Sequence, residues 1–366
     1  FIWNYFCFYS RRNLSDSSTM GVDWMKTIKG KQSVEFDHPP YIVGWASVVA
    51  DKEGKGPLGN RFDQVIEDPL FGEDTWEKAE GRFMKQAAML AIQKAGLSTS
   101  DIRYVFAGDL LEQNTATSYG LKDLDLPLFG LFGACSTVGE ALSLASMTVA
   151  GGFADQVLAT ASSHIGTAEK QFRFPLEYGN QRPLSATWTV TGAGGFIVSK
   201  QKSPIKVRGI TTGKIVDYGM KDPMNMGACM APAAAQVIYQ HFQDYSTSPK
   251  DYDAIYTGDL GEVGKQILIR LLEENGYDIS KVHGDCGLEV YENEKQDTHS
   301  GGSGCACSAV VLSAMLIRKL LNGEWNRILF VPTGALMSKT SFNEGESVTG
   351  IAHAILLERE EGSWNM

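Results

Sequence analysis

Cys135 is the residue of this sequence best placed to do chemistry. It lies in Gly-Ala-Cys135-Ser, between an apolar stretch typical of a buried strand (127–136) and a helix predicted from Thr137. A thiol at a helix N-terminus lies at the positive end of the helix dipole, which favours the thiolate and exposes the sulfur for nucleophilic attack or ligand binding. The alternative is a small residue that serves only to pack a tight turn.

Two aspartates end apolar runs that resemble each other. Asp109 closes IRYVFAGDL, and Asp259 closes YDAIYTGDL. If the two runs are equivalent strands, both carboxylates are expected to lie symmetrically about one pocket, where they could bind calcium directly. Capping of a turn is the commoner use of Gly-Asp at a strand end. We therefore favour turn capping over calcium binding for the two aspartates, and keep Asp259 as a pocket-lining residue.

A glycine-rich turn, Gly301 to Gly304, precedes a second helix and places Ser303 and Gly304 at the predicted pocket. His299 precedes this turn in a polar stretch and is interpreted as a surface histidine. The nearby Cys305-Ala-Cys307 has a one-residue gap, which is not the usual spacing of zinc ligands, so no metal is predicted.

The stretch 162–189 is long, polar and aromatic, which is typical of a functional loop or an interface. His164 follows a predicted strand end, where a ligand role and a purely structural hydrogen-bonding role are both open. Arg173 and Arg182 are the candidates to pair with a dicarboxylate. The aromatic neighbours of Arg173 could stack on a planar ring or fill a subunit interface.

The elements that must position these residues alternate between strand and helix, which predicts an α/β fold. The order of elements recurs: a helix at 76–95 and the strand ending at Asp109 have counterparts in a helix at 231–245 and the strand ending at Asp259. We therefore predict two equivalent halves, 26–202 and 203–366, with Cys307 at the place that Cys135 has in the first half. Near-continuous apolar strands predict mainly parallel sheets covered on both faces, with ligands at the carboxyl ends of the strands.

Composition narrows the class of protein. Apolar residues make up 43% of the 366 and charged residues 21%, as in globular proteins. A net charge of −10 without basic blocks argues against nucleic-acid binding and disfavours a free dianionic ligand unless arginine offsets the charge locally. Six cysteines without a framework spacing indicate a reduced, intracellular setting. The aromatic residues 1–25 match no signal peptide and are interpreted as a disordered or mis-started extension.

Several longer motifs carry a family resemblance: EGKGPLG, FAGDLL, LFGACST, ASSH, TAEKQFRFP, EYGNQRP, TVTGAG, MAPAAA, TGDL, GGSGCACSAVV and TGAL. Over residues 30–357 they make the chain similar to the thiolase superfamily, and within it to a branch of sporulation proteins. The resemblance implies a five-layered α/β fold built from duplicated βαβαβαββ halves, often as a homodimer.

The resemblance also implies a function. Cys135 matches the thiolase nucleophile, which would make the chain an acyltransferase. However, Asp259 stands where such enzymes carry a histidine base, and the turn before Cys307 lacks their asparagine, so we expect binding without turnover and no cofactor. The sporulation branch implies dipicolinic acid, free or as its calcium chelate, as the ligand. It further implies membrane-embedded channel subunits as partners and a peripheral place at the spore inner membrane.

Overall fold

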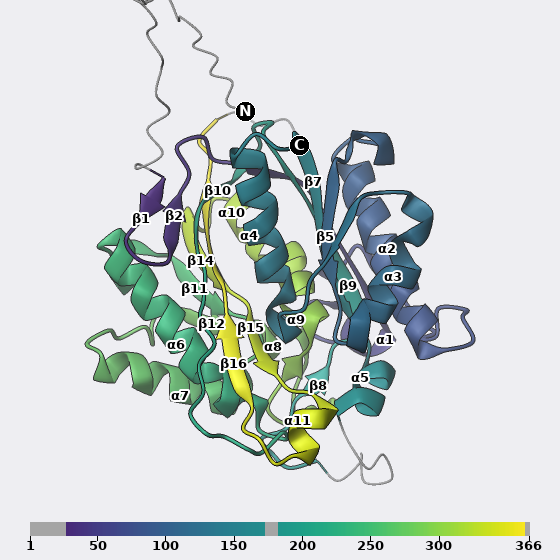
Figure 1. Cartoon of the computed structure of the whole chain (residues 1–366), viewed down its shortest axis with the longest axis vertical. Coiled ribbons are helices and arrows are strands. Elements are labelled where there is room, and N and C mark those ends of the chain that lie inside the picture. Colours follow the sequence, from purple (N-terminus) through teal and green to yellow (C-terminus); the bar gives the residue numbers. More distant parts are fainter. Residues whose placement is uncertain (1–26, 173–181, 363–366) are drawn as a thin grey trace, which may run out of the picture.

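The computed structural model describes residues 27–172 and 182–362 of the chain, with the side chains of Gln171 and Phe172 left aside (Figure 1). Residues 1–25, expected to form an N-terminal extension, therefore lie outside the described ranges.

The first half contains the predicted alternation of strands and helices. Its main elements are β3 (Tyr41–Ala50), α2 (Trp76–Lys94), β5 (Tyr104–Gly108), α3 (Thr115–Leu121), β6 (Leu128–Gly130), α4 (Thr137–Ala150), β7 (Gln156–Ser163) and β9 (Gly192–Ser199).

The second half repeats this order element by element. Its main elements are β10 (Ile205–Thr211), α6 (Met226–Tyr245), β11 (Ala254–Thr257), α7 (Gly261–Glu274), β12 (His283–Asp285), α9 (Cys305–Val311), α10 (Ile317–Leu321), β14 (Arg327–Val331) and β17 (Ala354–Arg359). One π-helical turn, Leu312–Leu316, joins α9 to α10. The duplicated βαβαβαββ plan is thus confirmed, and the expected boundary after residue 202 falls between β9 and β10.

Shorter elements complete the described part of the chain. They are β1 (Ile28–Lys29), β2 (Ser33–Glu35), α1 (Asp51–Gly54), β4 (Gln64–Ile66), α5 (Ile165–Phe172), β8 (Trp188–Thr189), α8 (Gly287–Val290), β13 (Gly302–Ser303), β15 (Thr333–Leu336), α11 (Lys339–Asn343) and β16 (Thr349–Ala352).

The strand order shows the duplication most directly. The main path runs β12-β11-β14-β17-β10-β3-β9-β7-β5-β6, so each half has the same order counted outward from β10 or β3. The two halves meet where Ile205 pairs with Ile42. Along this path, the outer three strands of each half are parallel and the remaining neighbours are antiparallel. The expectation of mainly parallel sheets was therefore wrong, because the last strand of each half returns antiparallel beside the first.

The elements form five layers, which Figure 1 shows nearly edge-on. Helices α2 and α3 cover the first-half strands on one side, and α6 and α7 cover the second-half strands on the other. Between the two sets of strands lie α4 and α9. All seven residues of α9 are buried, as expected for a helix of small apolar residues that is enclosed on every side.

Helix α6 begins five residues earlier than the sequence predicts. Its N-cap is Asn225, whose side chain accepts a hydrogen bond from the backbone N–H of Ala228, and Pro232 lies inside the helix. Proline is tolerated best in the first turn of a helix, which is why the pattern favoured a later start. The extra turn brings Met226 to the carboxyl ends of the strands. In the described ranges, no helix is both long and apolar enough to cross a membrane.

Candidate binding pocket at Cys135

Cys135 lies in a tight turn, Ala134–Ser136, that connects β6 to α4. Ala134 has a positive φ of 48°, which is unusual for a residue with a side chain. Two hydroxyl groups hold this turn: Ser136 Oγ donates to the carbonyl of Gly133 at 2.6 Å, and Thr137 Oγ1 donates to the carbonyl of Ala134 at 2.7 Å. The thiol is therefore held in place two residues before α4 begins.

A narrow pocket opens above this thiol at the carboxyl ends of the strands. Its volume is about 30 Å³, enough for one or two water molecules. The lining is mostly apolar and comes from both halves of the chain: Leu110, Phe132, Ala134, Cys135, Ala168, Thr189, Met226, Ser303, Gly304, Ala335 and Met337. Cys135, Ser303 and Gly304, three of the predicted ligand-binding residues, are thus brought together. Among the described residues that line the pocket, none is basic.

Asp259 lies behind the pocket wall, against the Cys135 thiol, and is only 1% exposed. Its Oδ2 accepts a hydrogen bond from the backbone N–H of Gly304 at 3.1 Å, and its Oδ1 accepts one from Thr333 Oγ1 at 2.8 Å. Burial raises the pKa of Asp259 to about 7, although the bonds from Cys135 and Thr333 act in the opposite direction. The carboxyl group therefore titrates near neutral pH.

The thiol itself is not activated. Burial raises the pKa of Cys135 well above its usual range, and the Asp259 carboxylate raises it further. The described lining includes no histidine, and the group that contacts the thiol is the Asp259 carboxylate, whose charge disfavours the thiolate. The arrangement therefore favours a neutral thiol that contacts a ligand over a thiolate that acts as a nucleophile.

Gly304 is required by this geometry. Its φ is +99°, and a Cβ placed there would lie 2.6 Å from Ser163 Oγ. That hydroxyl donates to the carbonyl of Val190 at 2.7 Å and accepts from the backbone N–H of Ala306 at 3.1 Å, so it cannot readily move. Only glycine lets the backbone N–H point at Asp259.

Asp109 does not lie at the pocket, contrary to the symmetric placement that the duplication predicted. It is 0% exposed, and both carboxylate oxygens accept bonds from the segment that follows β5. Oδ1 accepts from the N–H of Leu111 at 2.8 Å, while Oδ2 accepts from the N–H of Thr117 at 2.7 Å and from its hydroxyl at 2.6 Å. Asp109 is a loop-capping aspartate, the alternative that the sequence favoured over calcium binding. In the described ranges, no group of three or more His, Cys, Asp or Glu side chains is placed to hold a metal ion.

His164 takes the structural role of the two left open. Its Nε2 lies 2.9 Å from the carbonyl of Pro69, and its Nδ1 accepts from the N–H of Gly166 at 2.9 Å. The ring stacks on Trp76, with 6.3 Å between ring centroids. It is buried and does not line the pocket.

The two arginine candidates have different outcomes. Arg173 and Phe174 lie outside the described residues, and the side chain of Phe172 is among those left aside. Arg182 is held away from the pocket by Asp297, to which its Nη2 donates at 2.6 Å, and it lies over the ring of Trp188 at 4.9 Å. His299 also contacts Asp297, at 3.0 Å from Nε2 to Oδ1.

The two cysteines of the second-half helix are not equivalent to Cys135. Cys307 lies inside α9 and is fully buried, and its Sγ donates to the carbonyl of Gly258 at 3.6 Å. Cys305 is nearer the pocket floor, since its Sγ donates to the carbonyl of Ala134 at 2.9 Å. The predicted match of Cys307 to Cys135 was wrong because α9 begins at Cys305, whereas α4 begins two residues after Cys135.

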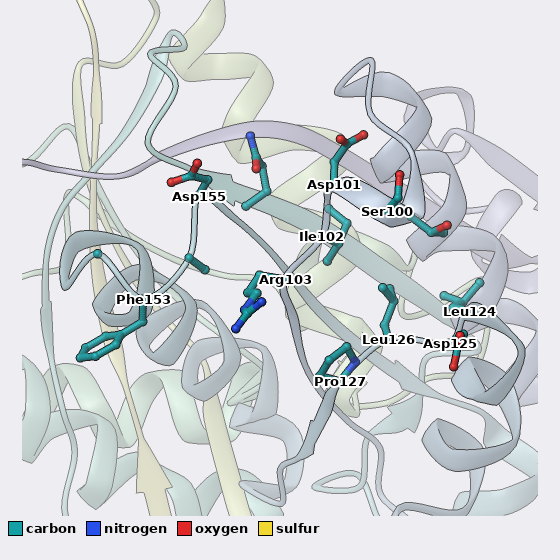
Figure 2. Close-up of a pocket in the computed structure, with 14 residues that line it drawn as sticks. Ser100, Asp101, Ile102, Arg103, Leu124, Asp125, Leu126, Pro127, Phe153 and Asp155 are labelled. Atoms are coloured by element: carbon teal, nitrogen blue, oxygen red, sulfur yellow. The ribbon is translucent and has the colours of Figure 1, made fainter.

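A larger open groove of about 710 Å³ lies at the opposite ends of β5, β6 and β7, where these strands begin (Figure 2). Arg103 projects into it, and Asp101, Asp125 and Asp155 also line it. Three carboxylates against one guanidinium would repel a dianion. Ligands of α/β sheets bind at the carboxyl ends of the strands, so the groove is not the candidate site.

Sequence reasoning missed most of the apolar lining. Met226 and Met337 belong to no motif that suggests chemistry, and Thr333 is distant in sequence from the aspartate that it contacts. A usable signal was available for Leu110, which directly follows Asp109 at a predicted strand end, and for Phe132, Ala134 and Ala335, which lie in the motifs LFGACST and TGAL.

Comparison with known proteins identifies the family. The family model described as stage V sporulation protein AD matches residues 30–358. Stage V sporulation protein AD of Bacillus subtilis (strain 168) is 44% identical over 336 residues, which cover 92% of this chain and 99% of the relative.

Solved structures show the fold alone. 3-Oxoacyl-[acyl-carrier-protein] synthase III from Aquifex aeolicus VF5 has a TM-score of 0.54 and 13% identity, covering 87% of this chain and 99% of that chain. A single-residue variant of OleA from Xanthomonas campestris has a TM-score of 0.57 and 13% identity, covering 90% of this chain and 99% of that chain. The fold is thiolase-like, and the chain belongs to the stage V sporulation protein AD family.

Proposed function

We propose that this sporulation protein binds dipicolinic acid, free or as its calcium chelate, in the pocket above Cys135 and does not transform it. The observation that carries the proposal is the contact between the Cys135 thiol and the Asp259 carboxylate, a negatively charged neighbour for a group that would have to become a thiolate in catalysis. A buried carboxylate raises the pKa of the thiol and would repel an oxyanion.

Charge favours the chelate. The chain carries a net charge of −10, and no described lining residue is basic. A one-to-one complex of calcium with the dicarboxylate is neutral, so it enters an apolar pocket without the cost of an uncompensated dianion.

The pocket must widen to admit a pyridine ring, because about 30 Å³ holds only water. Met226 and Met337 line it, and methionine side chains change rotamer easily. Phe132, also in the lining, is 46% exposed and so has room to move toward solvent. We therefore propose that these three side chains turn outward when ligand binds.

Titration calorimetry tests the proposal with dipicolinate, alone and with excess calcium chloride. We expect binding in both conditions, tighter with calcium. Cys135→Ser should retain binding within about threefold, since no covalent bond is proposed, whereas Ala335→Trp should fill the pocket and abolish it. Absence of any heat with the wild-type protein, under both conditions, would contradict the proposal.

Acyl transfer is the second candidate function, favoured by one observation: Cys135 lies in a strand-to-helix turn at the carboxyl ends of the strands. Incubation with acetyl-CoA followed by intact-mass measurement separates the candidates. An adduct on Cys135 that forms and then turns over would support the enzyme, and an unchanged mass supports binding alone.

For partners, we propose membrane-embedded channel subunits and a peripheral place at the spore inner membrane. We also propose a homodimer through β6, the strand that ends the main sheet path. Both Leu128 and Phe129 on this strand are exposed, at 40% and 52%. Light scattering of the wild type and of Phe129→Asp should show a dimer and a monomer, respectively.

A further inference from the structure

Asp259 is a buried acid whose surroundings hold no compensating cation among the described residues. The groups whose charges act on it or on which it acts are the thiols of Cys135, Cys286, Cys305 and Cys307 and the carboxylate of Asp285. Burial raises the pKa of all four thiols well above the usual range, so the thiols are neutral at physiological pH. The charge that these neighbours contribute is therefore negative.

Asp285 is the more strongly stabilised anion of the two aspartates, with a pKa that burial raises to about 6. Its Oδ1 accepts from the N–H groups of Gly261 and Gly287 at 3.0 and 3.1 Å, and its Oδ2 accepts from Leu260 N–H at 2.9 Å and from Thr257 Oγ1 at 2.6 Å. Asp259 has two such donors besides the thiol. Fewer donors stabilise the anion less, so Asp259 is the carboxylate that takes up a proton when another negative charge approaches.

We infer that the pocket takes up one proton on Asp259 when it binds a dicarboxylate dianion, so that binding of the free acid, unlike binding of its neutral calcium chelate, is linked to pH. The inference rests on the proposed function. The protein with ionised Asp259 combines with the dianion and with one proton from the buffer. In the resulting complex Asp259 is neutral and can donate a hydrogen bond.

The size of the effect follows from where Asp259 titrates. Burial raises the pKa of Asp259 to about 7, so in the ligand-free protein Asp259 is ionised in about 0.9 of the molecules at pH 8 and in about 0.1 at pH 6. A simple dicarboxylic acid is a dianion at both pH values. Proton uptake should therefore be about 0.9 per ligand at pH 8 and about 0.1 at pH 6. The dissociation constant should be about tenfold higher at pH 8 than at pH 6, which means weaker binding at pH 8.

Calorimetry of the full chain with dipicolinate at pH 8, in HEPES and in Tris, measures the uptake directly. The two buffers differ in ionisation enthalpy, so the difference in observed heat gives the protons taken up. We expect about 0.9 protons for wild type and none for Asp259→Asn. The neutral chelate, formed with excess calcium, should show a markedly smaller buffer dependence.

Asp109→Asn is the matched control, because Asp109 is an equally buried aspartate at the equivalent strand end of the other half. It should keep the wild-type uptake. Binding heats that are equal in the two buffers for wild type would overturn the inference and leave the proposed function intact. Loss of all binding heat at pH 6 and pH 8 would overturn both. The wild-type measurement decides the question even if a variant fails to fold.

Discussion

Asp109 and Asp259 occupy the same place in the two halves of the chain, yet they make different contacts. Each follows a Gly at the end of an equivalent parallel strand, β5 or β11. Asp109 accepts three bonds from the segment that directly follows its own strand. Asp259 instead reaches across to Gly304 and Thr333 and faces the Cys135 thiol.

The difference arises because another residue caps the loop in the second half. Asp285, at the end of β12, accepts bonds from Leu260 and Gly261, the residues that follow Asp259. Asp259 is thereby released from local capping and becomes available to the pocket. A duplicated backbone can thus keep its geometry while one half retains a structural residue and the other gains a ligand-facing one.

Truncation should separate the two aspartates most strongly in stability. Asp109→Ala leaves two buried N–H groups and a hydroxyl without an acceptor, so we expect a loss of about 3–5 kcal/mol in the free energy of unfolding. Asp259→Ala leaves one buried N–H group and one hydroxyl without this acceptor, and we expect a loss below about 2 kcal/mol. Urea unfolding at pH 7 measures both. Equal losses would mean that the two sites are energetically alike.

The stability of the Asp259→Asn variant should depend less on pH than that of wild type. The pKa of Asp259 is raised from 3.8 to about 7 in the folded protein. The folded state therefore holds a proton that the unfolded state releases, and stability falls as pH rises from about 4 to about 7. The variant lacks this contribution, at most about 4 kcal/mol. Urea unfolding at pH 4, 6 and 8 gives the two slopes, and parallel slopes would contradict the assignment.

Thiol reactivity should respond to one aspartate only. Because the Asp259 carboxylate adds to the burial that raises the pKa of Cys135, Asp259→Asn should speed alkylation of Cys135 by iodoacetamide about tenfold at pH 8. Asp109→Asn should leave the rate unchanged. Peptide mass mapping after timed alkylation identifies the modified cysteine. Faster alkylation in both variants would indicate general loosening of the fold instead.

The smallest contrast concerns two threonines. Thr117 donates to Asp109 at 2.6 Å, and Thr333 donates to Asp259 at 2.8 Å. Each substitution to valine should cost about 1 kcal/mol of unfolding free energy. Only Thr333→Val should change dipicolinate affinity. Besides the thiol, Asp259 accepts hydrogen bonds from Thr333 and from the backbone N–H of Gly304, and this substitution removes the first of them. An affinity change in Thr117→Val alone would reverse the comparison.

Much of the fold could be predicted from the sequence, because periodic apolar runs and glycine punctuation act locally. The helix beginning at Thr137 and the recurring order of elements are of this kind, and both are confirmed. The start of α6 could not be predicted in this way, because Pro232 favours a first turn and instead lies inside the helix. The predicted sheet pairing was also wrong, since parallel and antiparallel partners are chosen by strands far apart in sequence.

Site residues could be predicted where the local sequence around a residue determines its position in the fold. Cys135, Ser303 and Gly304 belong to turns that the sequence marks, and all three line the pocket. The roles of His164 and Asp109 depended on Pro69 and Thr117, which no local pattern links to them. The divergence of the halves depended on Asp285, which belongs to no motif that the duplication repeats.

A structure of the protein crystallised with dipicolinate tests the central claim most directly. We predict ligand density between Cys135 and Ser303, no bond to the sulfur, and outward rotation of Met226 and Met337. Density confined to the groove around Arg103, or continuous with the sulfur of Cys135, would contradict the account.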